Sequence, residues 1–166
     1  VTLDSPSVGE DGTMTFTASV DKAVQGGFSV NALFTDGTAK GGATAATGVD
    51  YINTTQALNF SGTAGETETF TVSLTDDAVV EANETFTVSF GGLSPATAPT
   101  GSFTTTSQGT GTIQNNDSAV VTLDSPSVGE DGTMTFTASV DKAVQGGFSV
   151  NALFTDGTAK GGATAA

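Results

Sequence analysis

The sequence feature that most constrains the fold is an internal repeat: residues 121–166 are identical to residues 1–46. The period is 120 residues (121 minus 1), which is too long for a solenoid repeat and suits one independent domain per period. Residues 47–120 occur once, so the chain holds only one set of C-terminal strands. We expect a domain at 1–117, a short linker at 118–120 and an incomplete N-terminal part of the next identical repeat at 121–166.

A permuted pairing is the alternative, because residues 121–166 could complete residues 47–117 and leave 1–46 unpaired. The linear arrangement is favoured by Asn115-Asn116-Asp117-Ser118, which is typical of the end of a strand followed by a linker. An incomplete copy exposes strand edges and half a core, so we expect it to be disordered or paired with another molecule. Strand exchange between neighbouring chains is a third arrangement.

Alternation of apolar and polar residues predicts β-strands along most of the first period. Thr13–Val20, Phe28–Phe34, Thr69–Leu74 and Thr85–Phe90 each place an apolar residue at every second position. About seven such segments and no helix are expected, which predicts an all-β fold, an immunoglobulin-like antiparallel β-sandwich. Eight of the eleven Phe lie in this period, and we interpret them as core in a chain without Cys or Trp.

Two segments are predicted to interrupt the strands. Pro6 breaks the first strand, as expected at an edge or at a change of sheet. The segment 91–101 contains Pro95 and Pro99 and is expected to be a loop.

Residues 76–84 form the most acidic stretch, with four carboxylates in nine residues: Asp76, Asp77, Glu81 and Glu84. They lie between the predicted strands 69–74 and 85–90, so we expect them at the turn of a hairpin. At ~5 Å and an effective dielectric constant of ~20, each like-charge pair costs roughly 3 kcal/mol. The chain has no Arg, and its four Lys lie elsewhere in the sequence. Calcium, a hard cation with six to eight oxygen ligands, can offset this repulsion, and a solvated acidic turn is the alternative.

Charge and composition exclude several function classes. The 18 acidic and four basic residues give a formal net charge of −14, which disfavours nucleic acid and an anionic membrane surface as partners. The absence of Cys and His removes thiol chemistry, the commonest general base and the commonest transition-metal ligand. No apolar run approaches the length of a membrane span, so no direct membrane insertion is expected. Paired acids can serve a glycosidase, but no aromatic sugar platform accompanies them, and we expect no enzyme.

Further carboxylates lie at predicted turns or strand ends: Glu10 with Asp11, Asp50, and Asp117. Alternate turns of an antiparallel sandwich fall at the same end of the molecule. We therefore expect these side chains to converge with the 76–84 loop at one end.

Taken together, these segments closely resemble the Calx-beta domain family, a module of the calcium-sensing part of sodium–calcium exchangers that recurs in tandem in large bacterial (RTX-type) surface adhesins. The resemblance spans almost the whole first period. It rests on Val8-Gly9-Glu10-Asp11-Gly12, Thr47-Gly48-Val49-Asp50-Tyr51, Leu58-Asn59-Phe60, Asp76-Asp77 through Glu81 to Glu84-Thr85-Phe86, and Ile113-Gln114-Asn115-Asn116-Asp117.

The resemblance implies a calcium site with a particular set of ligands. Asn115 and Asn116 stand where the best calcium binders of the family carry further Asp, which implies fewer ions or weaker binding. The implied ligands are Glu10, Asp50, Asp76, Asp77, the carbonyl of Val79, Glu81, Glu84, Asn116 and Asp117.

The resemblance and the exact repeat together predict a calcium-binding extender of a large secreted bacterial adhesin. Such a chain acts in cell adhesion or biofilm formation at the extracellular surface after type I secretion, and calcium stiffens each domain and junction. Neighbouring identical repeats are the expected partners. The alternative is a calcium-sensing regulatory domain of a membrane transporter, and a ligand-binding adhesin tip is a third hypothesis. The number of ions, their affinity, the number of repeats and the target of the adhesin stay open.

Overall fold

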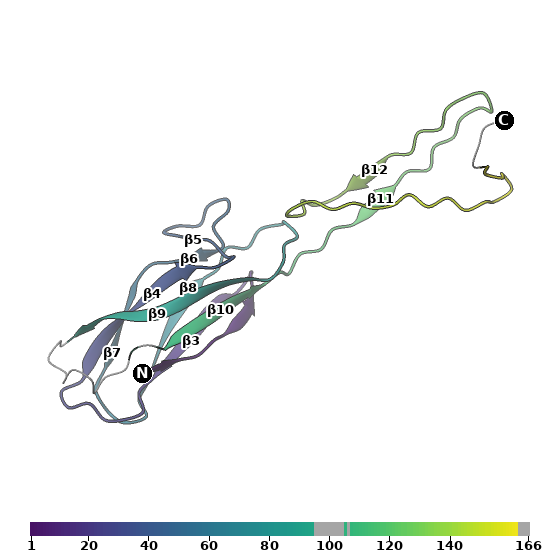
Figure 1. The fold of residues 1–166 in the computed structure, drawn as a ribbon. Coiled ribbons are helices and arrows are strands. Elements are labelled where there is room, and N and C mark those ends of the chain that lie inside the picture. The colour runs from purple at the N-terminus through teal and green to yellow at the C-terminus, as the bar shows by residue number, and fades with distance from the viewer. Residues whose placement is uncertain (95–104, 106, 163–166) are drawn as a thin grey trace.

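A computed structural model describes residues 1–94, 105 and 107–162, and within them every regular element is a β-strand (Figure 1). Within the described part of residues 1–117, two sheets pack together and a short two-stranded sheet, β5-β6, stands apart from them, which confirms the all-β, immunoglobulin-like sandwich. One sheet has the strand order β1-β3-β8, and the other has the order β2-β10-β9-β4-β7. The strands are β1 (Thr2–Leu3), β2 (Ser7–Gly9), β3 (Thr13–Ser19), β4 (Phe28–Asp36), β5 (Gly41–Gly42), β6 (Tyr51–Ile52), β7 (Gln56–Phe60), β8 (Thr67–Ser73), β9 (Glu84–Ser94) and β10 (Gln108–Gln114).

Pro6 marks a change of sheet, as the sequence predicted. Before it, β1 pairs antiparallel with β3, and after it, β2 pairs in parallel with β10 in the other sheet. The N–H of Thr112 donates to the carbonyl of Pro6 at 3.0 Å, which joins the crossover to β10. Because β2 ends at Gly9, this switch delivers Glu10 to the end of the five-stranded sheet.

The expected hairpin around the acidic loop is wrong. β8 pairs with β3 in one sheet, whereas β9 pairs with β4 and β10 in the other, so the acidic loop crosses between the sheets. A hairpin and a crossover between sheets give the same sequence pattern, because a strand with one buried face alternates apolar and polar residues in both arrangements. The loop spans 74–83, long enough to bridge sheets packed roughly 10 Å apart. The strand β9 also runs to Ser94, past the expected start of a loop at 91, and the rest of that predicted loop, 95–101, lies outside the described residues.

The core confirms the interpretation of the phenylalanines. The ring of Phe16 stacks on Phe70 across β3 and β8 with centroids 5.2 Å apart, and Phe28 stacks on Phe60 at 4.7 Å. Tyr51 of β6 stacks on Phe86 of β9 at 3.9 Å, which packs the segment after Asp50 against the five-stranded sheet. Phe103 lies outside the described residues.

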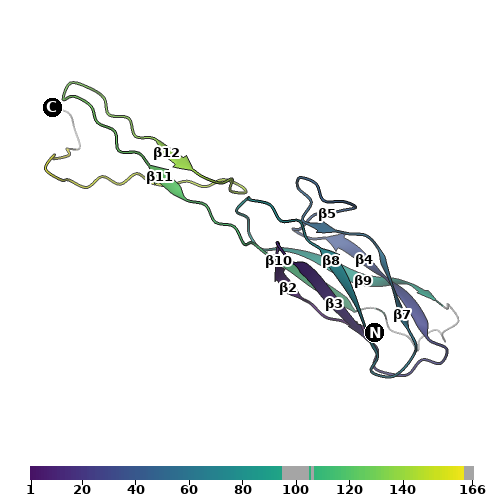
Figure 2. The same cartoon turned by 180° about the vertical axis from the view of Figure 1, so that it is seen from behind.

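The second copy, described to residue 162, extends away from one end of the sandwich in both views (Figures 1 and 2). Within the described residues of this copy, β11 (Val121–Leu123) and β12 (Ala138–Val140) pair in a two-stranded antiparallel sheet, and Val144 makes an isolated bridge with Val80 of the first copy. Identical residues therefore have opposite environments: Phe16 is 0% exposed and Phe136 is 46% exposed. The domain boundaries stay predictions, as do disorder or strand exchange of this copy. The described residues include no helix long and apolar enough to cross a membrane.

Candidate metal site at the acidic pole

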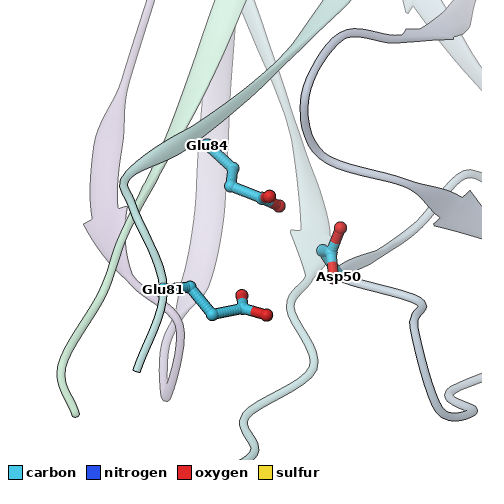
Figure 3. Close-up of side chains that lie close together, drawn as sticks. All are labelled: Asp50, Glu81 and Glu84. Carbon is cyan, nitrogen blue, oxygen red and sulfur yellow. The ribbon is translucent and has the colours of Figure 1, made fainter. Parts of the chain in front are cut away.

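The end of the sandwich nearest the second copy gathers carboxylates from several segments, and we call it the acidic pole. Asp50, Glu81 and Glu84 place carboxylate oxygen atoms within 4.8 Å of one another, and Figure 3 shows the three side chains turned toward a common point. A small pocket joins Glu10 and Asp77 to these three. The pole is defined by Glu10, Asp50, Asp76, Asp77, Glu81, Glu84 and Asp117.

Asp50 is positioned by a short connection ahead of β6. The N–H of Lys40 donates to Asp50 Oδ2 at 2.6 Å, and the N–H of Asp50 donates back to the carbonyl of Lys40 at 2.8 Å. The hydroxyl of the buried Tyr51 donates to Asp36 Oδ1 at 2.8 Å, which anchors the segment to the end of β4. Thr75 N–H donates to the Asp50 carbonyl at 3.0 Å, so the start of the acidic loop is tied to the same point.

Glu10 is the buried charged residue of the described chain, with 5% of its surface exposed. It continues the pairing of β2 with β10, since its N–H donates to the carbonyl of Gln114 at 3.2 Å. Its Oε1 accepts the N–H of Asn116 at 2.8 Å. Burial raises the pKa of the Glu10 carboxyl, the Asn116 N–H opposes this, and Asp117, Asp77 and Asp76 raise it further.

The acidic loop is braced against the residues that follow β10. Asn115 Oδ1 accepts the N–H of Glu81 at 3.0 Å, and Asn83 Oδ1 accepts the N–H of Asn115 at 3.1 Å. Glu84 begins β9, opposite Ile113 of β10. This bracing holds the loop carboxylates beside the chain segment that carries Asp117.

Crowding at the pole raises the pKa values of its glutamates. Burial, a hydrogen bond with Asp50 and the charges of Asp50 and Glu81 raise the pKa of Glu84 to about 7, against a small opposing effect of Gln145. Burial and the charges of Asp77, Asp50 and Glu10 also raise the pKa of Glu81. The site therefore resists full ionisation unless positive charge is supplied.

The structure does not bring all of the predicted ligands to the same place. Asp76 accepts a hydrogen bond from the side-chain amide of Asn116 at 3.3 Å, at the edge of the cluster. Asp77 lines the pocket and caps its own turn, where Oδ1 accepts the N–H of Val79 at 2.7 Å. No contact of the described chain places the carbonyl of Val79 among the carboxylates, and Asp11 is exposed.

Side chains of the second copy also reach the pole, which the sequence analysis did not predict. Lys142 Nζ lies 2.5 Å from Asp117 Oδ1, and the side-chain amide of Gln145 donates to Glu81 Oε1 at 3.3 Å. Lys142 is far from residues 76–84 along the chain, so its position in the sequence does not indicate this contact. The three-residue linker was the available signal, since it keeps the start of the next copy near Asp117.

The donor set fits a hard divalent cation. Asp117 Oδ2 and Thr75 Oγ1 are buried without a hydrogen-bond partner within the described chain, and Thr75 lines the pocket. A buried polar atom without a partner costs about 1–3 kcal/mol, which a bound ion can offset. Oxygen atoms of carboxylates, a hydroxyl and amides are the ligands that calcium prefers. The residues that could hold such an ion are Glu10, Asp50, Thr75, Asp77, Glu81, Glu84 and Asp117.

Comparison with known proteins points to one family. The family model for the Calx-beta domain matches residues 2–117 and again 114–164. Two solved structures share the fold at 20% sequence identity: the crystal structure of calcium binding domain CBD12 of CALX1.1, with a TM-score of 0.55, and that of CBD12 from CALX1.2, with a TM-score of 0.52. The match to each covers 70% of this chain, and 45% and 46% of those chains respectively. No curated protein matches the sequence.

Proposed function

The chain is a member of the Calx-beta domain family, and from this premise we propose that it is a calcium-binding structural repeat that extends a large secreted bacterial adhesin. The observation that carries calcium binding is the convergence of Asp50, Glu81 and Glu84 within 4.8 Å, beside the unpartnered buried oxygen of Asp117. A bound ion would supply two positive charges to a site in which burial and neighbouring carboxylates raise the pKa values of Glu10, Glu81 and Glu84. We propose no catalytic role.

The binding site would draw on segments that are far apart in the sequence. Glu10, Asp50, the 76–84 loop and Asp117 lie at the ends of separate strands or in the loops between them. An ion held by several of them would tie these segments together in the folded state alone, because the unfolded chain does not hold them close. Mass action then gives roughly 2.7 kcal/mol of added stability at calcium a hundredfold above Kd.

The extender role is supported by the repeat and by the charge. Identical copies suit a spacer whose length matters more than the identity of each domain, and the chain has no Cys to require oxidative pairing. In the low calcium inside a cell, repulsion at each pole would keep the array loose enough for export. Outside the cell, calcium would neutralise each pole and stiffen the linker next to Asp117, so that a distal adhesive region projects from the surface.

The test is thermal unfolding of the chain in calcium and in chelator, followed by the fluorescence of Tyr51 or by circular dichroism. We expect a higher unfolding midpoint in calcium and a smaller gain in magnesium, which prefers six ligands in stricter geometry. As a matched pair, Glu10→Gln should reduce the gain and Glu130→Gln, at the identical position of the second copy, should not. Equal midpoints in calcium and in chelator would contradict the proposal.

A regulatory calcium sensor is the second candidate, and one contact favours it. Gln145 of the second copy touches Glu81 of the acidic pole, so an ion there could move the next copy. The two candidates differ in how calcium changes the distance between the copies. In an extender, calcium should narrow the distribution of distances between the copies, whereas in a sensor calcium should shift the mean distance. Transporter segments in the parent chain would favour the sensor.

A further inference from the structure

The two halves of the first copy, residues 1–42 and 47–117, meet at an interface that passes through both sheets. In one sheet β3 pairs with β8, and in the other β4 pairs with β7 and β9 while β2 pairs with β10. Aromatic rings cross the same interface, since Phe16 stacks on Phe70 and Phe28 stacks on Phe60. The described residues of 47–117 therefore present a surface complementary to residues 1–42, here called the acceptor surface.

The second copy carries the same residues as the first half of the sandwich, without an acceptor surface against them. Residues 121–162 are identical to residues 1–42. Phe28 is 5% exposed, whereas Phe148, the same residue of the second copy, is 51% exposed. The same contrast holds for Met134, Phe136, Val140 and Val150, whose counterparts in the first copy are buried. The first copy thus shows which surface these side chains fit.

Part of the second copy already has the conformation that packs on the acceptor surface in the first copy. β11 pairs with β12 in the register of β1 with β3. The N–H of Thr137 donates to Asp124 Oδ1 at 2.8 Å, and the N–H of Thr17 donates to Asp4 Oδ1 at the same distance. Within the described residues, β11 and β12 have no third strand beside them, whereas β3 has β8. The second copy therefore offers a preorganised strand to a partner.

The acceptor surface of the same chain is out of reach of this copy. The first half of the sandwich starts at the end away from the acidic pole, where Leu3 N–H donates to Ser107 Oγ at 3.0 Å. From there it runs beside β10, which spans about 23 Å in its seven residues. The linker 118–120 leaves at most about 14 Å between Asp117 and Val121. Val121 cannot take the place of Val1, so the acceptor surface must belong to another chain.

We propose that residues 121–162 of one chain take the place of residues 1–42 on the acceptor surface of another chain. The partner is a second copy of this chain, and the inference goes beyond the proposed function without requiring calcium. Residues 43–48, which connect the two halves, are all exposed, so the halves of the receiving chain can separate there. The exchange replaces one set of contacts with an identical set. Its extent therefore depends on protein concentration and on the integrity of residues 1–42.

The experiment mixes two chains that carry one cysteine each, Thr69→Cys and Thr137→Cys, since the chain itself has no Cys. Thr17 lies opposite Thr69 in the first copy, so position 137 of a donated second copy would lie opposite position 69 of the receiving chain. Directly opposed residues of antiparallel strands have Cα atoms about 5 Å apart, which suits a disulfide.

The two chains are unfolded in urea, mixed at high concentration and refolded in chelator, in a glutathione buffer that lets disulfides exchange. Mass spectrometry then measures the disulfide between positions 69 and 137. In the control, Thr87→Cys on β9 of the other sheet replaces Thr69→Cys. The disulfide between positions 69 and 137 is expected to be roughly fivefold more abundant than that between 87 and 137.

Matched changes of one ring test whether the donated segment is buried. Phe136→Ser in the Thr137→Cys chain should lower the yield of the 69–137 disulfide, because the donated ring would be buried as Phe16 is. Phe16→Ser in the Thr69→Cys chain should raise it, because the segment that competes for the acceptor surface is weakened. Equal yields at positions 69 and 87, or a yield unchanged by Phe136→Ser, would overturn the exchange. Enrichment of a disulfide between two 137 positions would also overturn it, by showing that two second copies pack on each other.

Discussion

Replacement of Glu84 by glutamine is expected to change stability in opposite directions with and without calcium. The side chain keeps its size, and its amide can still donate to Asp50, as the protonated carboxyl does. The change removes two of the three like-charge pairs among Asp50, Glu81 and Glu84, whose oxygen atoms lie within 4.8 Å. It also removes a negative charge that a cation would use.

The magnitude follows from the spacing and from the pKa. At an effective dielectric constant of about 20, a like-charge pair separated by 4.8 Å costs about 3.5 kcal/mol. A pKa of about 7 for Glu84, in place of 4.5, limits the cost of its charge at pH 8 to about 3 kcal/mol. Glu84 is half-buried, so solvent screening reduces this to roughly 1–2 kcal/mol, the gain expected for Glu84→Gln in chelator.

The assay is urea unfolding at pH 8 with calcium and with chelator. The midpoint of Glu84→Gln should exceed that of wild type in chelator, and the added stability from calcium should be smaller than in wild type. Glu68→Gln is the control, because Glu68 lies near the start of β8, at the far end of that strand from the acidic loop. Equal midpoints for Glu84→Gln and wild type in chelator would refute the account of repulsion at the pole.

Three further predictions follow from the same structure. In chelator, stability should rise as the pH falls from 7 toward 4.5, because the raised pKa of Glu84 makes the folded chain bind more protons than the unfolded chain in that window; a stability curve that falls there contradicts it. Phe16→Ala should cost about 3–5 kcal/mol in urea unfolding, whereas Phe136→Ala, the same change in the exposed copy, should stay within about 0.5 kcal/mol; equal losses would place both rings in one environment. Gly62→Ala should lower the melting midpoint more than Gly65→Ala. Both glycines have positive φ, at +92° and +76°, but of the two only Gly62 has a backbone oxygen 1.9 Å from the position that a Cβ would take. A similar loss in both variants would show that this close approach does not affect stability.

The sequence was sufficient for the fold class because alternation reports directly on burial. Met14, Phe16 and Ala18 of β3 were predicted to share one face, and all three are buried. Alternation does not indicate which strands are neighbours in a sheet. The sequence therefore predicted a hairpin between β8 and β9, whereas the connection crosses from one sheet to the other.

The composition of the pole could be predicted, but its contact with the next copy could not. Turn positions and the family resemblance indicated Glu10, Asp50 and Asp117 from segments far apart in the chain. Lys142 and Lys22 have identical neighbours in sequence, yet only Lys142 has a carboxylate partner. That difference arises from the position of the second copy after the linker, which local sequence does not encode.

Anomalous scattering from calcium-soaked crystals of the chain tests the central claim most directly. The account predicts an anomalous peak bounded by the carboxylates of Asp50, Glu81 and Glu84. The peak should disappear when the soaking solution contains chelator in place of calcium. A pole without a peak, or calcium bound only elsewhere on the acidic surface, would contradict it.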